Sequence, residues 1–369
     1  MDDAAVHPAY KDAPNVLTEI PRYAAETPPS LGPKPRGLCA MLPEGIPRLN
    51  LALFAITLLT TTMAGAYVAG ADLSLRHPIA FITGLAMGLS FSLPLMAILL
   101  AHEMGHYLTA RRNGVNTSLP YFIPAPLPSV FFIGTFGAFI RLRQMPPTRR
   151  VMFDIGAAGP WAGMMIALPC VMIGLHLSEI QPLTQGAGGL ELGNSLLFYG
   201  LSRWMLGVDP NLVNVNLSPI AFAGWLGFLV TMLNLLPSGQ FDGGHVLYAL
   251  TPRHHRKIST IFVFGCVLMF VVPLALGRAY WPGWLLWAVI AVGLGLGHPS
   301  TVDRDAPLGS GRTVAAWLTV ALFILTFMPN PISISAPADA PPQPEQSQTY
   351  SVMHHAPGSA IHRAITTRI

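Results

Sequence analysis

The stretch PLMAILLAHEMGHYLTARR, residues 94–112, ends a long apolar run with three ionisable side chains. On a helix, His102 and His106 lie four residues apart on one face, so both imidazoles can reach a single metal ion. Glu103 lies beside them and need not be a ligand. Ionisable groups at the end of a membrane helix are costly to bury, so they indicate a functional site. The alternative is a hydrogen-bonded polar cluster near the membrane interface.

The rest of the chain favours a membrane setting. Of its 369 residues, 52% are hydrophobic and only 10% are charged, whereas an ordinary soluble domain has about 25% charged residues. A water-facing surface therefore cannot cover most of this chain. The three cysteines, Cys39, Cys170 and Cys266, are scattered, which excludes a disulfide framework or a thiolate zinc site.

The apolar runs predict an all-α polytopic membrane protein with about six to seven transmembrane helices. Each span needs about 20 apolar residues. The candidate spans are residues 49–70, 79–110, 151–177, 218–237, 258–277, 283–297 and 313–328. The second is too long for one perpendicular crossing and contains Pro94, so we expect a tilted, kinked or split helix. Residues 190–206 have an amphipathic pattern that predicts a segment at the membrane surface.

The two ends of the chain differ from its middle. Residues 1–47 and 329–369 are rich in proline and polar residues, which predicts a disordered cytoplasmic arm and a disordered tail around a transmembrane domain at 48–328. The first residues lack the pattern of a cleaved signal peptide, so we expect the first apolar run to be kept as a span.

Lysine and arginine assign an orientation, because cytoplasmic loops carry their excess. With the N-terminus inside and seven crossings, the inside segments hold sixteen of the 21 Lys and Arg residues. This bias predicts that the HEMGH end of the second span faces the cytoplasm.

The segment between the second and third spans is too broken by Pro and Gly for a helix. Its part FFIGTFGAFIRLR, residues 131–143, alternates loosely as a strand or hairpin does. Non-helical backbone at membrane depth must be buried in protein or line a water cavity. We therefore predict a re-entrant β-hairpin here, with an ordinary cytoplasmic loop as the alternative.

A third metal ligand is needed, because catalytic zinc sites usually have three protein ligands and one water. Asp242 follows the 218–237 span and is flanked by two glycines, where the backbone can turn closely around an ion. Asp242 could instead only cap the next helix. His245 could be a fourth ligand, but a hydrolase keeps one position for water, so we interpret it as a supporting residue.

Two further residues have predicted roles in the chemistry. Glu103 fits a general base that takes a proton from water and passes it to the leaving amine. Asn234 could donate to a developing oxyanion or hold the backbone of a substrate strand. An interhelical hydrogen bond is the other interpretation of Asn234. The glycines in AAGPWAG, residues 157–163, are interpreted as helix packing.

Three motifs on separate spans, HEMGH, AAGPWAG and NLLPSGQFDGG (residues 234–244), occur in this order. They resemble the site-2 protease family of intramembrane zinc metalloproteases. The resemblance extends from about residue 80 to 312, and PYFIPAP and GTFGAFI are similar to a bacterial branch. The spacing between spans is too short for an inserted PDZ domain, and nothing after the last span resembles a regulatory CBS domain, so we expect a compact branch of the family.

The resemblance implies that His102, His106 and Asp242 bind one zinc ion per chain and that Glu103 is the catalytic base. It implies that Asn234 helps to hold or polarise the substrate. The expected activity is hydrolysis of peptide bonds within or beside a transmembrane segment, in regulated intramembrane proteolysis. The expected substrate is a single-span membrane protein in a bacterial cytoplasmic membrane, with no nucleic-acid partner.

Two other functions compete with this one. A membrane metal transporter explains the intramembrane His and Asp but not the glutamate beside the first histidine. A catalytically silent scaffold of the same fold conflicts with the presence of every expected catalytic residue. Because a transmembrane helix must unwind before it is cut, we also expect a strand near residues 131–141 to receive it by β-addition.

Overall fold

The structure is a computed structural model that describes residues 47–335, with gaps at 75, 127–130, 183–188, 210–211, 299–300, 302 and 304–305, together with residues 365–367. The predicted arm, 1–47, lies outside the described residues apart from Pro47, as does most of the predicted tail. Two short strands, β6 (Ile332–Ser335) and β7 (Ile365–Thr367), fall within that tail. The disorder of both ends stays a prediction.

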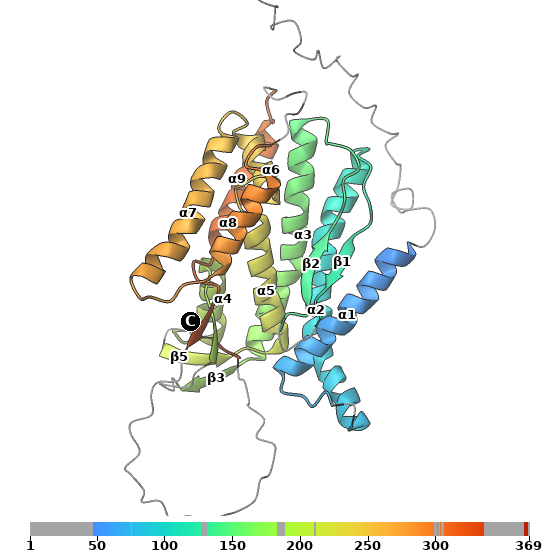
Figure 1. The fold of residues 1–369 in the computed structure, drawn as a ribbon, viewed down its shortest axis with the longest axis vertical. Helices are drawn as coiled ribbons and strands as arrows, with labels where there is room; N and C mark the ends of the chain where they lie inside the picture. Colours follow the sequence, from blue (N-terminus) through green and yellow to red (C-terminus); the bar gives the residue numbers. More distant parts are fainter. Residues whose placement is uncertain are drawn as a thin grey trace, which may run out of the picture.

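Each apolar run of the sequence forms a helix in the described residues (Figure 1). These helices are α1 (Arg48–Val68), α2 (Pro78–Arg112), α3 (Arg149–His176), α5 (Pro219–Asn234), α7 (His255–Ala275), α8 (Gly283–Leu294) and α9 (Ser310–Thr326). Of these, α1, α2, α3 and α7 are long and apolar enough to cross a membrane, whereas α5, α8 and α9 are apolar but shorter. The chain is a polytopic membrane protein, and the number of crossings stays a prediction.

The helix α2 carries the HEMGH motif near its C-terminal end. It is 35 residues long and continues through Pro94, so the run is not split into two helices, and a tilt or kink in the membrane stays a prediction. At 1.5 Å per residue it is about 52 Å long, well beyond the ~30 Å hydrocarbon core of a bilayer. Two basic residues, Arg111 and Arg112, occupy its last turn, where they complement the negative end of the helix dipole.

A β-hairpin is present between α2 and α3, as predicted, and its re-entrant position in a membrane stays a prediction. Its strands β1 (Tyr121–Pro124) and β2 (Thr135–Phe139) are antiparallel, and Tyr121 pairs with Phe139. Gly134, directly before β2, has a φ of 77°, which suits glycine because it has no Cβ. Figure 1 shows these short strands alongside α1 and α2.

Hydrogen bonds from α1 hold this hairpin at two points. The amide of Asn50 donates to the carbonyl oxygens of Leu119 (3.1 Å) and Pro120 (2.8 Å). The hydroxyl of Thr60 donates to the carbonyl oxygen of Gly134 over 2.7 Å. Because both ends of the hairpin are tied to one helix, α1 fixes where the hairpin lies relative to α2.

A five-stranded sheet, which the sequence did not predict, lies at the lower end of Figure 1. Its order is β3-β5-β7-β4-β6, with β3 (Glu179–Pro182), β4 (Gly189–Leu192) and β5 (Val213–Asn216). Next to it is the helix α4 (Leu196–Leu206), which has buried Phe198 on one side and exposed Trp204 on another. The amphipathic pattern of residues 190–206 thus belongs to one strand and one helix, and its place at a membrane surface stays a prediction.

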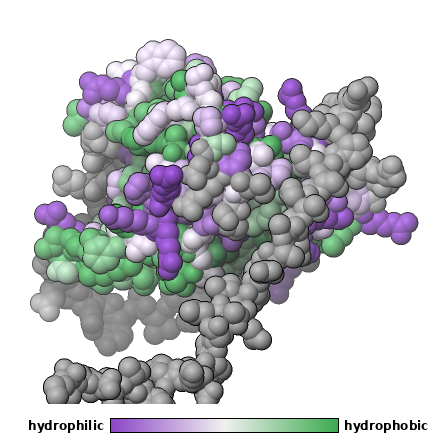
Figure 2. Space-filling view, turned by 90° about the horizontal axis from the view of Figure 1, so that it is seen from above, coloured by the Kyte–Doolittle hydropathy of each residue, from purple (hydrophilic) through white to green (hydrophobic). Residues whose placement is uncertain are grey.

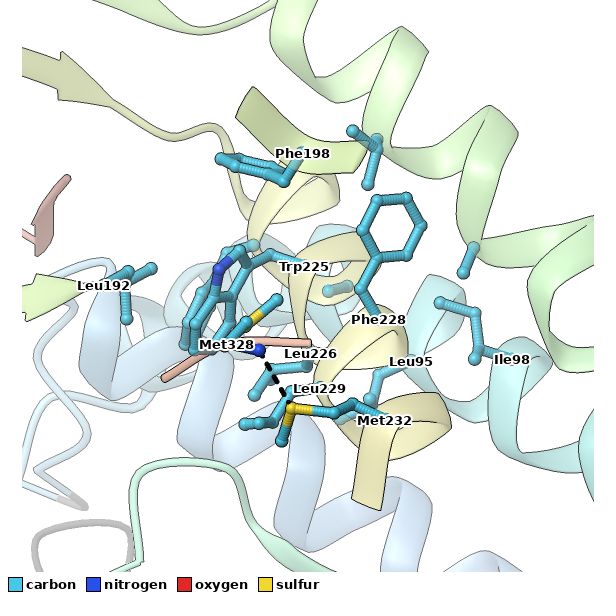
Figure 3. Close-up of a cluster of buried hydrophobic side chains, with 14 of the residues drawn as sticks. Leu95, Ile98, Leu192, Phe198, Trp225, Leu226, Phe228, Leu229, Met232 and Met328 are labelled. Carbon is cyan, nitrogen blue, oxygen red and sulfur yellow. Dashed lines mark hydrogen bonds between the residues drawn. The ribbon is translucent and has the colours of Figure 1, made fainter. Parts of the chain in front are cut away.

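The helix α5 forms the centre of the main hydrophobic core. Figure 3 shows its side chains Trp225, Phe228 and Met232 packed among residues of α2 and α4. All three are fully buried. The sulfur of Met232 also accepts a hydrogen bond from the backbone N–H of Met328, which follows α9 (3.1 Å). Because α5 is enclosed along its length, its packing fixes the position of its last residue, Asn234.

The outer surface separates into apolar flanks and a polar end. Figure 2, seen from the upper end of Figure 1, shows hydrophilic side chains gathered over that end, with hydrophobic side chains around part of the rim. That end holds the last turn of α2 and the first turn of α3, where Arg149 and Arg150 lie. The flanks include α7, on which Ile261, Phe264 and Leu268 are exposed. This distribution suits a protein whose sides contact lipid.

Candidate metal centre

The two histidines of HEMGH meet on one face of α2, as their spacing predicts. Their Nε2 atoms lie 3.0 Å apart. Only 3% of His102 and 6% each of Glu103 and His106 are exposed. Three ionisable side chains are therefore buried together within one turn of an apolar helix, an arrangement that is costly without partners.

Asp242 completes this cluster from a different helix. Its Oδ2 atom lies 3.2 Å from the Nε2 atoms of both His102 and His106. In the described part of the chain, these three residues form the group whose potential ligand atoms all lie within 4.8 Å of one another. Tetrahedral zinc with bonds of about 2.0–2.1 Å would place neighbouring ligand atoms about 3.3 Å apart. The triangle of one carboxylate and two imidazoles therefore fits zinc in both size and chemistry.

The chain between α5 and α6 (Asp242–Leu250) explains how Asp242 reaches the histidines. Pro237 follows the end of α5 and stops that helix. Gly239 then turns the chain with a φ of 53°, and α6 begins at Asp242 itself. A side chain on Gly243 would collide with the carbonyl oxygen of Leu235, so the turn closes only with glycine there. The carboxylate also lies in the first turn of α6, where the helix dipole favours a negative charge.

His106 is oriented by a hydrogen bond on its other ring nitrogen. Its Nδ1 lies 2.7 Å from the carbonyl oxygen of Ile155 on α3. A carbonyl oxygen can only accept, so Nδ1 carries the proton and Nε2 is left with its lone pair. A metal-binding histidine usually has its remaining N–H held in this way. The lone pair of His106 therefore faces Asp242 and His102.

Asn234, the last residue of α5, reaches the same cluster. Its side-chain nitrogen lies 3.2 Å from Nε2 of His102. That ring nitrogen is also the atom available to a metal. With a metal in place, the amide is released to bind another acceptor. The sequence left open whether Asn234 joins the site or only ties two helices together, and the structure places its amide at the site.

Glu103 lies beside the metal ligands but outside the group that could hold the ion. Its carboxylate accepts a hydrogen bond from the backbone N–H of Ile140, which directly follows β2. The hairpin therefore touches the one acidic side chain of α2. This contact brings the predicted substrate-receiving segment next to the predicted base.

The glycines of AAGPWAG lie against the metal ligands themselves. A Cβ on Gly159 would collide with the ring of His106, and one on Gly163 would come within 3.2 Å of the Cβ of His102. Helix α3 can pack this closely on α2 only because these positions lack side chains. The sequence correctly predicted a packing role. It did not identify the packed partners, although the four-residue spacing of the two glycines matches that of the two histidines.

His245 lies one turn after Asp242 on α6 and is not in the metal-binding group. Its Nδ1 is instead 2.8 Å from Nε2 of His298, which follows α8. The interpretation of His245 as a supporting residue fits this position. The sequence analysis did not consider His298, since nothing near it in the chain marks a site.

Apolar helices surround a buried group of two histidines and an aspartate that could hold a metal ion, so the chain is an integral membrane protein with a candidate metal centre. The family model of peptidase family M50 matches residues 90–276, which include every residue of the centre. The chain therefore belongs to peptidase family M50. This confirms the predicted membership of the site-2 protease family.

Two plant proteins illustrate the relationship. A rice protein (Oryza sativa subsp. japonica) named "Probable zinc metalloprotease EGY1, chloroplastic" is 32% identical over 63% of this chain and 39% of its own length. Its Arabidopsis thaliana counterpart is 29% identical over 70% of this chain and 45% of its own length. The chain thus spans about two fifths of the curated relatives that it matches. No solved structure matches it.

Proposed function

We propose that this protein is a zinc-dependent intramembrane protease that cuts single-span membrane proteins within or beside their transmembrane segments. The convergence of His102, His106 and Asp242, with Glu103 buried beside them, carries the proposal. The relatives are named probable zinc metalloproteases, which supports zinc as the metal. We propose one ion per chain.

The chain's own residues divide the chemistry among them. Zinc, when bound, supplies a Lewis acid for peptide hydrolysis. Glu103 accepts a proton from the attacking water on its carboxylate and delivers it to the leaving nitrogen. The amide of Asn234 donates to the carbonyl oxygen of the scissile bond as that oxygen becomes negative. The bond from His106 to Ile155 holds the proton of the neutral imidazole on Nδ1, which leaves the lone pair of Nε2 for the metal.

The substrate approaches along the free edge of β2. The N–H of Ile140 faces Glu103, and backbone groups alternate along a strand, so the N–H of Ala138 faces the same side. In the described residues β2 pairs only with β1. An unwound substrate segment that pairs with this edge would lie beside Glu103, a case of β-addition. The exposed rings of Phe136 and Phe139 favour a re-entrant hairpin that receives an apolar segment.

The competing functions fit the site less well. A transporter needs a series of binding groups along its path, whereas the described residues contain one group able to hold an ion. A silent scaffold would not need Glu103, yet this carboxylate is kept buried and hydrogen-bonded beside the ligands. Regulated intramembrane proteolysis therefore remains the proposed activity.

We place the active site toward the cytoplasm. The polar end of the molecule holds the HEMGH end of α2 and the first turns of α3 and α7. These three helix ends each carry two basic residues: Arg111 and Arg112, Arg149 and Arg150, and Arg256 and Lys257. The particular membrane is a proposal too: the sequence suggests a bacterial cytoplasmic membrane, while the relatives' names place those proteins in chloroplasts.

The central test compares the wild type with Glu103→Gln in detergent. Both forms should hold about one zinc per chain, because Glu103 is not a ligand. Only the wild type should cut single-span test substrates, with a loss of at least about 100-fold in the variant. Equal cutting by both forms would show that another group is the base, and wild type without zinc would refute the metal centre.

A further inference from the structure

Residues that follow α8 contact the helix α6. His245, one turn after Asp242, hydrogen-bonds through Nδ1 to Nε2 of His298 over 2.8 Å. One of the two rings donates and the other accepts. Both side chains are at least partly buried, so the bond is shielded from bulk water.

The next turn of α6 is held by the same region. The ring of Tyr248 stacks on His298 with centroids 4.3 Å apart and an interplanar angle of 19°. Its hydroxyl accepts a hydrogen bond from the backbone N–H of Thr301 over 3.0 Å. His245 and Tyr248 are three residues apart and share one face of α6. His298 therefore contacts two successive turns of the helix that begins with Asp242.

The chain before Asp242 touches this region as well. The side-chain amide of Gln240 donates to the carbonyl oxygen of Leu294 (3.3 Å). A Cβ on Gly239 would lie 2.6 Å from the carbonyl oxygen of Gly295. Residues on both sides of Asp242 thus pack against the end of α8 and the residues after it. All of these contacting residues lie beyond the family match, which ends at 276.

On its other side, α6 packs against α3. A Cβ on Gly156 would lie 2.7 Å from the Cβ of His245 and 3.4 Å from the carbonyl oxygen of Asp242. His245 is therefore enclosed between the backbone of α3 and the ring of His298. If His298 is removed, this face of α6 loses its support, and the helix can rotate or shift away from α2.

We infer that His298 is a positioning residue for the metal centre: by holding His245 and Tyr248, it fixes α6 so that Asp242 faces His102 and His106. The inference deepens the proposed function and rests on its metal centre. Asp242 is the one proposed ligand outside α2. The three ligands can therefore converge only if α6 keeps its position relative to α2. Loss of a residue that supports a metal ligand typically lowers metal affinity about 10–100-fold.

The test measures zinc affinity by competition with a chelator on purified full-length protein. The variants are His298→Ala, His298→Gln and the matched control His254→Ala, whose exposed side chain makes no capping bond. We expect His298→Ala to bind zinc about 10–100-fold more weakly. His298→Gln should recover part of this loss, because its amide can still bond with His245, and the control should match the wild type. The absorption spectrum of the cobalt-substituted protein should change in His298→Ala, since the ligand geometry around the ion changes.

The outcomes separate the inference from the function that it refines. Zinc affinity and cobalt spectra equal to wild type in His298→Ala would overturn the inference and leave the metal centre intact. Absence of zinc from every form, wild type included, would overturn both. If His298→Ala does not purify as a folded protein, His298→Phe takes its place, because it keeps a ring that can stack on Tyr248 and removes the hydrogen bond to His245. A several-fold loss of affinity in that variant supports the inference, and unchanged affinity contradicts it.

Discussion

At the scale of single residues, the centre separates side chains that would bind the metal from side chains that would act on the substrate. His102, His106 and Asp242 converge on one point, so removing any of them should release the ion. Asn234 and Glu103 touch the same cluster from its edge. Their removal should leave zinc bound and change only the rate of cleavage, which makes their roles distinguishable by experiment.

Asn234→Ala tests this distinction at the end of α5. The variant should keep about one zinc per chain, because the amide is not a ligand. Its kcat should fall about 100-fold, as happens when one donor to a developing oxyanion is lost, with a smaller change in KM. The measurement is steady-state cleavage together with zinc content. A variant that loses its zinc would instead show that Asn234 acts by holding His102.

Gly159→Ala tests the close packing of α3 on a metal ligand. The added methyl group would collide with the ring of His106, so we expect zinc affinity to fall at least about tenfold. The matched control is Gly265→Ala on α7, where a Cβ meets nothing within 4 Å. Zinc retained after dialysis against a chelator is the readout. Equal retention by Gly159→Ala and the wild type would mean that the two helices can separate without cost.

The sequence could predict the candidate ligands, which the structure brings together, but not what lies against them. His102 and His106 are recognisable because their spacing is local, and Asp242 because acids are rare beside apolar spans. The contact of Gly159 with His106 depends on how α2 and α3 cross. The bond between His245 and His298 joins residues 53 positions apart. No short-range pattern contains either contact, so both required the structure.

At the scale of elements, the hairpin links the membrane helices to the site. It is tied to α1 through Asn50 and Thr60 and touches Glu103 through Ile140. A substrate strand added to β2 would therefore be aligned by α1 on one side and presented to α2 on the other. The sequence predicted a hairpin here because Pro and Gly exclude a helix and residues 131–143 alternate as a strand does. The sequence did not predict the five-stranded sheet, because its strands have only three or four residues each and pair with strands that are far away in the sequence.

Ala138→Pro tests β-addition at β2. Proline removes the N–H that faces the Glu103 side, and a strand edge tolerates proline where that N–H is not bonded to the neighbouring strand. We expect cleavage to fall about tenfold, the upper end for loss of one net hydrogen bond, with zinc content unchanged. Ala138→Ser keeps the N–H and should cut like the wild type. If Ala138→Pro cuts as fast as Ala138→Ser, substrates do not pair with this edge.

At the scale of the whole molecule, the helices alternate direction so that the basic segments gather at one end. The end of α2, the start of α3 and the start of α7 meet at the upper end of Figure 1, and the loops after α1 and α7 lie toward the other end. Basic residues are favoured on the cytoplasmic side. The same polar end lies nearest the HEMGH motif. The side of the membrane that this end faces is therefore also the side that the active site faces.

Cysteine labelling in a background without Cys39, Cys170 and Cys266 tests which side of the membrane the polar end faces. Met145→Cys lies in the exposed chain between the hairpin and α3, and Ala279→Cys lies in the exposed loop after α7. A membrane-impermeant thiol reagent should reach Ala279→Cys in intact cells and Met145→Cys only in inverted vesicles. The physical reason is that arginines near Met145 are retained on the cytoplasmic side, while the apolar α7 carries the chain across. Labelling of both positions from one side would mean that the chain crosses the membrane an even number of times between them, so at least one of α3, α5 and α7 does not cross. The reverse pattern would turn the active site away from the cytoplasm.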